Sequence, residues 1–154
     1  MKKLNLILSS FFIILLIFIS NKTLGEEKII FGNAIVIDGD TIKINNNKIR
    51  LFGIDAPEIK QTCKRNYLNI YFFSFKKKYF CGKISAQKLK KLINNKIIKC
   101  YIEGIDRYNR KLAICHRNKL NINSRLVRTG HAVAYKKYSK KYIKEEAEAK
   151  KDKL

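Results

Sequence analysis

The segment Ile49-Arg50-Leu51-Phe52-Gly53-Ile54-Asp55-Ala56-Pro57-Glu58 joins an apolar strand pattern to a group of charged side chains. Its β-branched and large apolar residues favour a strand over residues 48–54, which the following proline ends. Side chains alternate along a strand, so Arg50 and Asp55 would lie on opposite faces. They can share one site only if the chain bends between them, and Gly53 permits that bend.

Two more strand patterns precede this segment and complete a three-stranded meander. Residues 28–37 are rich in Ile, Val and Phe, and residues 41–44 alternate between apolar and polar. Asp38-Gly39 between them is a strong signal for a two-residue hairpin. Asn45-Asn46-Asn47 supplies the next turn. Asp38 and Gly39 read most simply as turn residues, which leaves Asp40 without a turn role.

The second half of the chain supplies a helix and two further strands. Residues 59–82 read as irregular, with many aromatic residues and lysines. Residues 85–93 have the periodicity of an amphipathic helix, with Ser85 as its N-cap. Residues 97–102 and 111–117 are expected to be the fourth and fifth strands.

Helical patterns follow the fifth strand. Asn121 or Asn123 can cap a short helix through Val127, and Gly130 is a suitable residue after its end. Residues 138–153 have the mixed charge of a last, solvated helix. The element order predicts a mainly β protein with helices (α+β): an OB-fold, a five-stranded barrel with about three helices.

The chain is expected to carry an export segment before this domain. Residues 1–25 resemble a secretory signal peptide, with two lysines, an uncharged stretch over residues 4–19, and Thr23-Leu24-Gly25 as a cleavage site. An uncleaved membrane anchor is the alternative, although the stretch is shorter than the roughly 20 residues of a full span. We therefore expect one domain over residues 26–154 in a secreted or periplasmic protein, with transient membrane contact through the signal segment; the alternative is a membrane-anchored protein.

The chain is strongly basic. Its 154 residues carry a formal net charge of +22, and removal of residues 1–25, which contain three lysines and no acid, leaves +19. Such a charge attracts polyanions and disfavours basic partners. Because Lys, Ile and Asn are all abundant, which compositional bias also produces, charge alone does not identify nucleic acid as the partner.

Four cysteines and an export segment favour disulfides. No Cys-x-x-Cys is present, so a zinc knuckle is not expected, and three connectivities are possible. We expect Cys63–Cys81, which brackets the aromatic-rich segment. We also expect Cys100–Cys115, because both residues lie equally far from the turn between the fourth and fifth strands, where an antiparallel pair would bring them together.

Carboxylates form the first part of a candidate site. Asp40 and Asp55 are a candidate pair for calcium, because carboxylate oxygens, carbonyls and waters suit a hard cation. Two histidines alone, His116 and His131, do not make a zinc cluster. Glu58 can orient or deprotonate a water, or it is an ordinary loop residue.

Arginines and tyrosines form the second part. Arg50 and Arg110 can flank a phosphate and stabilise the charge that develops on it. Alternatively, Arg50 lies on a solvated face and Arg110 pairs with Asp106. Tyr108 and Tyr135 can contact a nucleotide, or they pack as ordinary aromatic residues. Acids and arginines together are the groups needed to hydrolyse a phosphodiester.

Four segments of this chain resemble the staphylococcal nuclease (thermonuclease) family. They are Ile37–Thr41, Arg50–Glu58, Asp106–Arg110 and Leu126–Ala132, and the similarity runs from about Ile30 to the C-terminus. Asn109 stands where the family usually has glycine. The cysteine-containing segment 59–82 resembles secreted Gram-negative members of the family.

The resemblance implies an OB-fold and calcium-dependent hydrolysis of DNA and RNA. We expect the protein to be a monomer that takes DNA and RNA as substrates. It implies that Asp40 and Asp55 bind calcium together with the backbone carbonyl of Thr41. It further implies that Arg50 and Arg110 bind the scissile phosphate while Glu58 acts on the attacking water.

The resemblance also implies contacts further along the substrate. Arg107 and Tyr108 fall near its terminal phosphate, and Tyr135 corresponds loosely to a tyrosine that packs on a base. The alternative function is a non-catalytic OB-type module that binds nucleic acid, possibly anchored to a membrane. Such modules typically lose the acids or arginines, all of which this chain retains.

Overall fold

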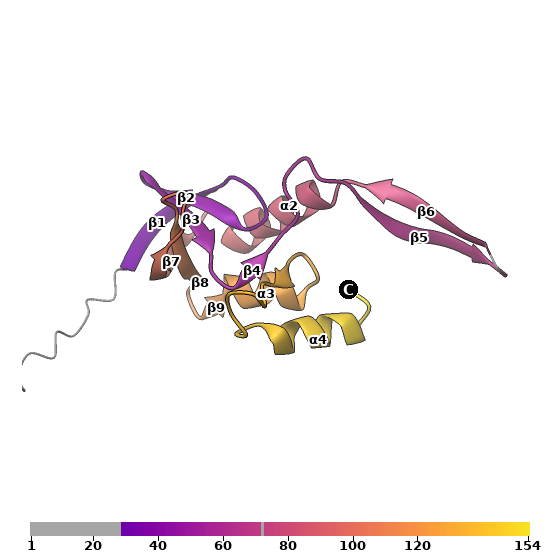
Figure 1. Ribbon diagram of the computed structural model, residues 1–154. Helices are drawn as coiled ribbons and strands as arrows, with labels where there is room; N and C mark the ends of the chain where they lie inside the picture. The colour runs from indigo at the N-terminus through magenta and orange to yellow at the C-terminus, as the bar shows by residue number, and fades with distance from the viewer. Residues whose placement is uncertain (1–28, 72) are drawn as a thin grey trace, which may run out of the picture.

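The computed structural model describes residues 29–71 and 73–154 (Figure 1). The expected signal or anchor segment, residues 1–25, lies outside this part of the chain. Five strands form the main sheet: β1 (Ile29–Val36), β2 (Thr41–Ile44), β3 (Asn47–Leu51), β7 (Ile97–Ile105) and β8 (Lys111–Arg117). A short strand, β9 (Leu120–Asn121), extends its edge.

Pairing between β3 and β8, the two ends of the five-stranded order, closes this sheet into a barrel. The strand order is β3-β2-β1-β7-β8, and β3 also pairs with β8 in parallel, with Arg50 opposite Leu112. The meander is confirmed, since Val36 lies opposite Ile42 and Ile44 lies opposite Asn47. The expected α+β fold, an OB-fold barrel with three helices, is therefore confirmed.

The barrel is filled by apolar side chains from alternate strand positions. The fully buried apolar side chains on the barrel strands are Ile42, Ile44, Ile49, Leu51, Ile98, Cys100, Ala113 and Cys115. Each fully buried aliphatic side chain contributes about 1.5–3 kcal/mol by leaving water. This core makes the barrel a firm support for the loops at its rim.

The structure has three helices: α2 (Cys81–Ile93), α3 (Ile122–Arg128) and α4 (Ile143–Lys151). The first two pack on the barrel, and α4 packs on α3 (Figure 1). The expectation that Ser85 caps α2 is wrong, because the helix begins at Cys81 and buries Ser85 within it. The cap of α3 is Asn121, whose side chain accepts a hydrogen bond from the Ser124 amide. Gly130 follows that helix with a φ of 69°, as expected for a residue after a helix end.

The segment predicted to be irregular contains a β-hairpin, which corrects that expectation. Strands β5 (Cys63–Ile70) and β6 (Phe73–Tyr79) pair with each other alone and extend away from the barrel and helices (Figure 1). Both expected disulfides are present, Cys63–Cys81 at the base of this hairpin and Cys100–Cys115 between β7 and β8. Among the described residues, no helix is long and apolar enough to span a membrane.

Candidate nuclease site

Asp40 lies at the end of a loop between β1 and β2 that is longer than expected. In place of a two-residue hairpin, residues 37–40 form the connection, and the amides of Ile37 and Asp38 both donate to the Thr41 carbonyl. The Asp38 carboxylate accepts the Asp40 amide at 3.1 Å, which confirms Asp38 as a turn residue. A side chain at Gly39 would overlap Ser85 and Ala56, so the loop packs closely on α2.

The Asp40 carboxylate is almost completely buried, with 3% of the residue exposed. It accepts hydrogen bonds from the Thr41 hydroxyl at 2.9 Å and from the Ala56 amide at 3.3 Å. Burial raises the pKa of Asp40 to about 7, although the Arg50 charge acts in the opposite direction. A cation at this position would favour the ionised carboxylate.

A turn at Phe52-Gly53 brings Arg50 and Asp55 together. Gly53 has a φ of 74°, a conformation that favours glycine, and the chain then forms the two-residue strand β4 (Ile54–Asp55). Alternation no longer separates the two side chains, and Arg50 Nη2 lies 2.6 Å from Asp55 Oδ1. The bend expected at Gly53 is thus confirmed.

Asn123 holds the Phe52-Gly53 turn through hydrogen bonds of its buried side chain, a role that the sequence analysis did not predict. Its buried side-chain amide donates to the carbonyls of Phe52 and Ala113, and its oxygen accepts the Cys115 amide. The sequence marks Asn123 only as an alternative helix cap. The sequence signal for it is a polar residue on the apolar stripe of a short helix.

Glu58 lies just beyond, in a loop held by its backbone. Its amide donates to the Gln61 side chain at 3.2 Å, and its carbonyl accepts the Gln61 amide at 2.7 Å. A side chain on Gly82 would overlap the Glu58 carbonyl, so only glycine allows α2 to begin this close. The Glu58 side chain is exposed and has no partner among the described residues.

Arg110 is held by Asp106 in the turn before β8. The carboxylate of Asp106 accepts Arg110 Nε at 2.7 Å and the amides of Tyr108 and Arg110 at 2.9 Å. Burial alone would raise the pKa of Asp106, but these hydrogen bonds, from Arg110 first, hold it below its usual value. Asn109 adopts a φ of 59° in this turn, which asparagine tolerates in place of glycine.

The β3–β8 register places both arginines at the same end of this strand pair. Arg50 lies opposite Leu112, and Arg110 is the residue just before β8, two residues before Leu112. The Arg110 terminal nitrogens have no hydrogen-bond partner among the described residues. They remain available to an anion that approaches Arg50.

Three further residues, Arg107, Tyr108 and Tyr135, were expected to contact the substrate. Arg107 donates to the Tyr108 hydroxyl at 2.7 Å, and the Arg107 and Arg110 guanidinium carbons lie 4.8 and 5.4 Å from the exposed Tyr108 ring. Tyr135 is half-buried; its amide donates to the Gly53 carbonyl and its ring packs edge-on against Tyr138 at 4.9 Å. Tyr108 is therefore presented to solvent, whereas Tyr135 supports the turn next to Asp55.

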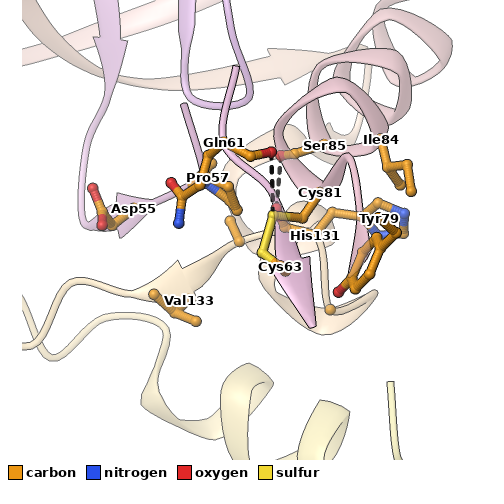
Figure 2. Close-up of a pocket in the computed structure, with 13 residues that line it drawn as sticks. Asp55, Pro57, Gln61, Cys63, Tyr79, Cys81, Ile84, Ser85, His131 and Val133 are labelled. Atoms are coloured by element: carbon orange, nitrogen blue, oxygen red, sulfur yellow. Dashed lines mark hydrogen bonds between the residues drawn. A yellow bond between two sulfur atoms is a disulfide. The ribbon is translucent and has the colours of Figure 1, made fainter. Parts of the chain in front are cut away.

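A pocket of about 330 Å³ opens beside Asp55 (Figure 2). The strand β10 (Val133–Ala134) pairs with β4, which places Val133 opposite Asp55 at the pocket edge. Ser85 donates to the His131 carbonyl at 2.7 Å across the pocket floor, and the Cys63–Cys81 disulfide forms part of the wall. The space beside Asp55 is therefore partly apolar and open to solvent.

The two aspartates fit a hard cation. Arg50 Nη2 lies 2.9 Å from Asp40 and 2.6 Å from Asp55, so both carboxylates converge on one positive charge. The described residues contain no cluster of three or more His, Cys, Asp or Glu side chains that could hold a metal. The Thr41 carbonyl, expected to be a third ligand, accepts the amides of Ile37 and Asp38 within its own loop. Two carboxylates with backbone oxygens and waters are a donor set that suits calcium.

Comparison with known proteins agrees with the geometry. Residues 48–154 match the family described as staphylococcal nuclease homologue. The chain is 35% identical over 113 residues to the succinoglycan biosynthesis protein ExoI of Rhizobium meliloti, covering 71% of this chain and 54% of that protein. It is 34% identical over 131 residues to an uncharacterized endonuclease of Haemophilus influenzae, covering 82% and 64%. A probable staphylococcal-like nuclease of Oryza sativa subsp. japonica, CAN2, is 30% identical over 102 residues, covering 66% and 23%. The chain thus spans about half to two thirds of the bacterial relatives.

Proposed function

This chain belongs to the staphylococcal nuclease homologue family, and we propose that it is a calcium-dependent nuclease that hydrolyses phosphodiester bonds of DNA and RNA. One observation carries the proposal: Arg50 joins the buried Asp40 to the more exposed Asp55 through contacts of 2.9 and 2.6 Å. The arginine that would bind phosphate therefore lies in direct contact with the two carboxylates that would bind calcium.

Asp40 and Asp55 would hold the calcium ion. When bound, calcium supplies positive charge that neutralises a phosphate oxygen and lowers the barrier to attack by water. Asp40 is held by the Thr41 hydroxyl and the Ala56 amide and also by Arg50, whose contact calcium would replace. Asp55 is half-exposed and leaves room for the substrate.

Arg50 and Arg110 bind the scissile phosphate through their planar forks. Asp106 takes only Nε of Arg110, which orients that side chain and leaves both terminal nitrogens for phosphate oxygens. Contacts of this kind strengthen as negative charge develops on phosphorus, so they act mainly on the transition state. Glu58, unpaired and at the rim, orients and deprotonates the attacking water.

Three residues extend the substrate site. Arg107 and the exposed Tyr108 lie beside Arg110, which supports contacts to the next phosphate along the strand. Tyr135, behind the Gly53 turn, packs near the adjoining base. Two disulfides support an oxidising compartment, secreted or periplasmic, or a membrane-anchored location facing it.

Release of acid-soluble nucleotides from DNA and from RNA tests this function. The purified chain should release them in calcium and stop when calcium is chelated. Arg110→Ala and Glu58→Gln should each lower the rate by about a hundredfold or more, whereas Arg125→Ala, an exposed arginine elsewhere, should leave it unchanged. Binding of nucleic acid with no release in any metal would identify the chain as a non-catalytic OB-type module instead.

A further inference from the structure

The β5–β6 hairpin has two different faces. Cross-strand partners share a face, and the pairs Cys63–Tyr79, Arg65–Lys77 and Leu68–Phe75 lie on one of them. Phe73 lies two residues before Phe75 on the same strand, so it lies on the same face. We call the set Arg65, Leu68, Phe73, Phe75 and Tyr79 the aromatic face of the hairpin.

The opposite face is polar and basic. Lys64 pairs with Lys78, and Asn66 pairs with Lys76, all of them exposed. Lysines directly opposite each other destabilise a two-stranded hairpin, because like charges repel across the pair. No Asp or Glu occurs between Ile59 and Ile102 to offset them. An anion bound along the hairpin would remove this repulsion.

The aromatic face is exposed along its outer part. Phe73 is 71% exposed and Phe75 is 55% exposed, an unusual condition for two neighbouring phenylalanines. The barrel and helices do not cover them, since the hairpin extends past α2 (Figure 1). Exposed aromatic residues on a basic surface are the combination that binds single-stranded nucleic acid by stacking.

The inner end of this face is part of the candidate site. Cys63 and Tyr79 line the pocket that opens beside Asp55 (Figure 2), and the Arg65 guanidinium carbon lies 5.8 Å from the Tyr79 ring. The Cys63–Cys81 disulfide ties the base of the hairpin to the first residue of α2. A strand that leaves the site through the pocket therefore meets Tyr79 first, then Phe75 and Phe73.

The spacing of these rings favours a single strand over a duplex. Rings on every second strand residue are roughly 7 Å apart. Stacked bases in a duplex are about 3.4 Å apart and are closed to stacking by a side chain. A single strand with separated bases can instead place one base against each ring, as sheet-based RNA-binding domains do.

We propose that the β5–β6 hairpin is an accessory binding arm for single-stranded nucleic acid, with bases stacked on Phe73, Phe75 and Tyr79, while the lysines of the opposite face attract the polyanion to the arm. This proposal rests on the proposed function, because the nuclease site is what would bring a nucleic-acid strand to the hairpin. It adds a subsite outside the scissile phosphate, which would select long single strands over short ones.

Fluorescence anisotropy of the whole chain with a labelled oligothymidylate of about 20 nucleotides tests the arm. A chelator is present throughout, so no hydrolysis is required for the measurement. The variant Phe73→Ala/Phe75→Ala should bind roughly tenfold more weakly for each ring removed. The matched control is Phe31→Ala/Ile35→Ala, which removes two equally exposed apolar side chains from the barrel, 67% and 68% exposed. It should bind as the wild type does.

A small diester, bis(4-nitrophenyl) phosphate, separates the arm from the catalytic site. Hydrolysis of this diester in calcium should be unchanged in the Phe73→Ala/Phe75→Ala variant, because the diester is too small to span from the catalytic site to the hairpin. Lost oligonucleotide binding with no diester hydrolysis even in wild type would support the arm and overturn the proposed function.

Three results would overturn the arm. The first is equal affinity of the phenylalanine variant and wild type for the oligonucleotide. The second is an equal loss on a duplex of the same length, which would deny single-strand stacking. The third is unchanged oligonucleotide affinity with lost binding to phosphatidylserine vesicles, which would assign the aromatic face to a membrane surface.

Discussion

Arg50 contacts the buried carboxylate of Asp40 through both terminal nitrogens, with Nη1 3.1 Å from Oδ1 and Nη2 2.9 Å from Oδ2. This two-point contact aligns the planar guanidinium with the carboxylate. The same fork is suited to two oxygens of a phosphate. The pair therefore keeps Arg50 oriented toward the place where substrate and calcium would meet.

Arg50→Lys should lower kcat by about a hundredfold or more while changing KM little, because the planar fork acts mainly on the transition state. Steady-state kinetics on single-stranded DNA in calcium measure this. Arg125→Lys, the same change at an exposed position, is the control. A near-normal kcat for Arg50→Lys would count against the phosphate clamp.

Calcium should stabilise the folded protein even without substrate. Binding to the folded state alone adds about 2.7 kcal/mol to the unfolding free energy at roughly 100 times Kd, which raises the melting temperature. Asp55→Asn should abolish the rise, and Asp152→Asn, a surface carboxylate on the far end of α4, should retain it. An equal rise in Asp55→Asn and wild type would place the calcium elsewhere.

Glu146 should make the stability of α4 depend on acid pH. Its carboxylate contacts Lys136 at 2.7 Å and Lys150 at 3.3 Å, and hydrogen bonding from Lys136, followed by that from Lys150, holds its pKa below the usual value. A lowered pKa in the folded state stabilises above the unfolded pKa, about 4.3, and this stabilisation is lost as pH falls through the folded pKa.

Urea unfolding of Glu146→Gln at several pH values checks this. The variant should lose roughly 1 kcal/mol near pH 7 and show a shallower loss of stability below pH 5. Glu148→Gln removes a more exposed partner of Arg128 and should cost about 0.5 kcal/mol or less. Identical acid slopes for Glu146→Gln and wild type would contradict the prediction.

The two disulfides should contribute unequally to global stability. Each closes a loop for which the chain-entropy relation gives about 3 kcal/mol. Cys100–Cys115 lies fully buried in the barrel, so Cys100→Ala/Cys115→Ala should lose that amount or more. Cys63→Ala/Cys81→Ala should lose less, because the exposed hairpin can fray in the folded state and regain entropy. Equal losses in chemical denaturation would show that the hairpin is firmly held.

Local sequence patterns were sufficient to predict the barrel. Alternation in residues 41–44 and 48–51, with asparagines between, specifies a hairpin whose register follows from one buried face. The pairing of Cys100 with Cys115 could be predicted because both lie equally far from the Asp106 turn. The bend at Gly53 could be predicted because Arg50 and Asp55 can share one site only if the chain bends between them.

The hairpin over residues 63–79 could not be predicted in the same way. Both of its faces are largely exposed and carry cations, so the alternation in its sequence does not mark a buried face as it does in the barrel strands. The start of α2 was missed because Phe80 provides no side-chain cap, while Ser85 resembles one. The last helix begins at Ile143 and not at Tyr138, since residues 138–142 form turns that bury Tyr142.

The site residues were placed by spacing, but their contacts required the three-dimensional structure. The sequence separates Asp38, a turn residue, from Asp40, but only the structure shows that Asp40 is buried and faces Arg50. The engagement of the Thr41 carbonyl by two amides could not be read from sequence. Neither could Asn123, whose partners are 10 and 71 residues away.

The most direct test of the central claim is release of acid-soluble nucleotides from single-stranded DNA by wild type and Asp55→Ala, each in calcium and in chelator. We predict rapid release by wild type in calcium alone, and loss of nearly all release in the variant although its circular dichroism shows the same fold. Full release by wild type in chelator, or by Asp55→Ala in calcium, would contradict the claim that this pair of aspartates and Arg50 form a calcium-dependent nuclease site.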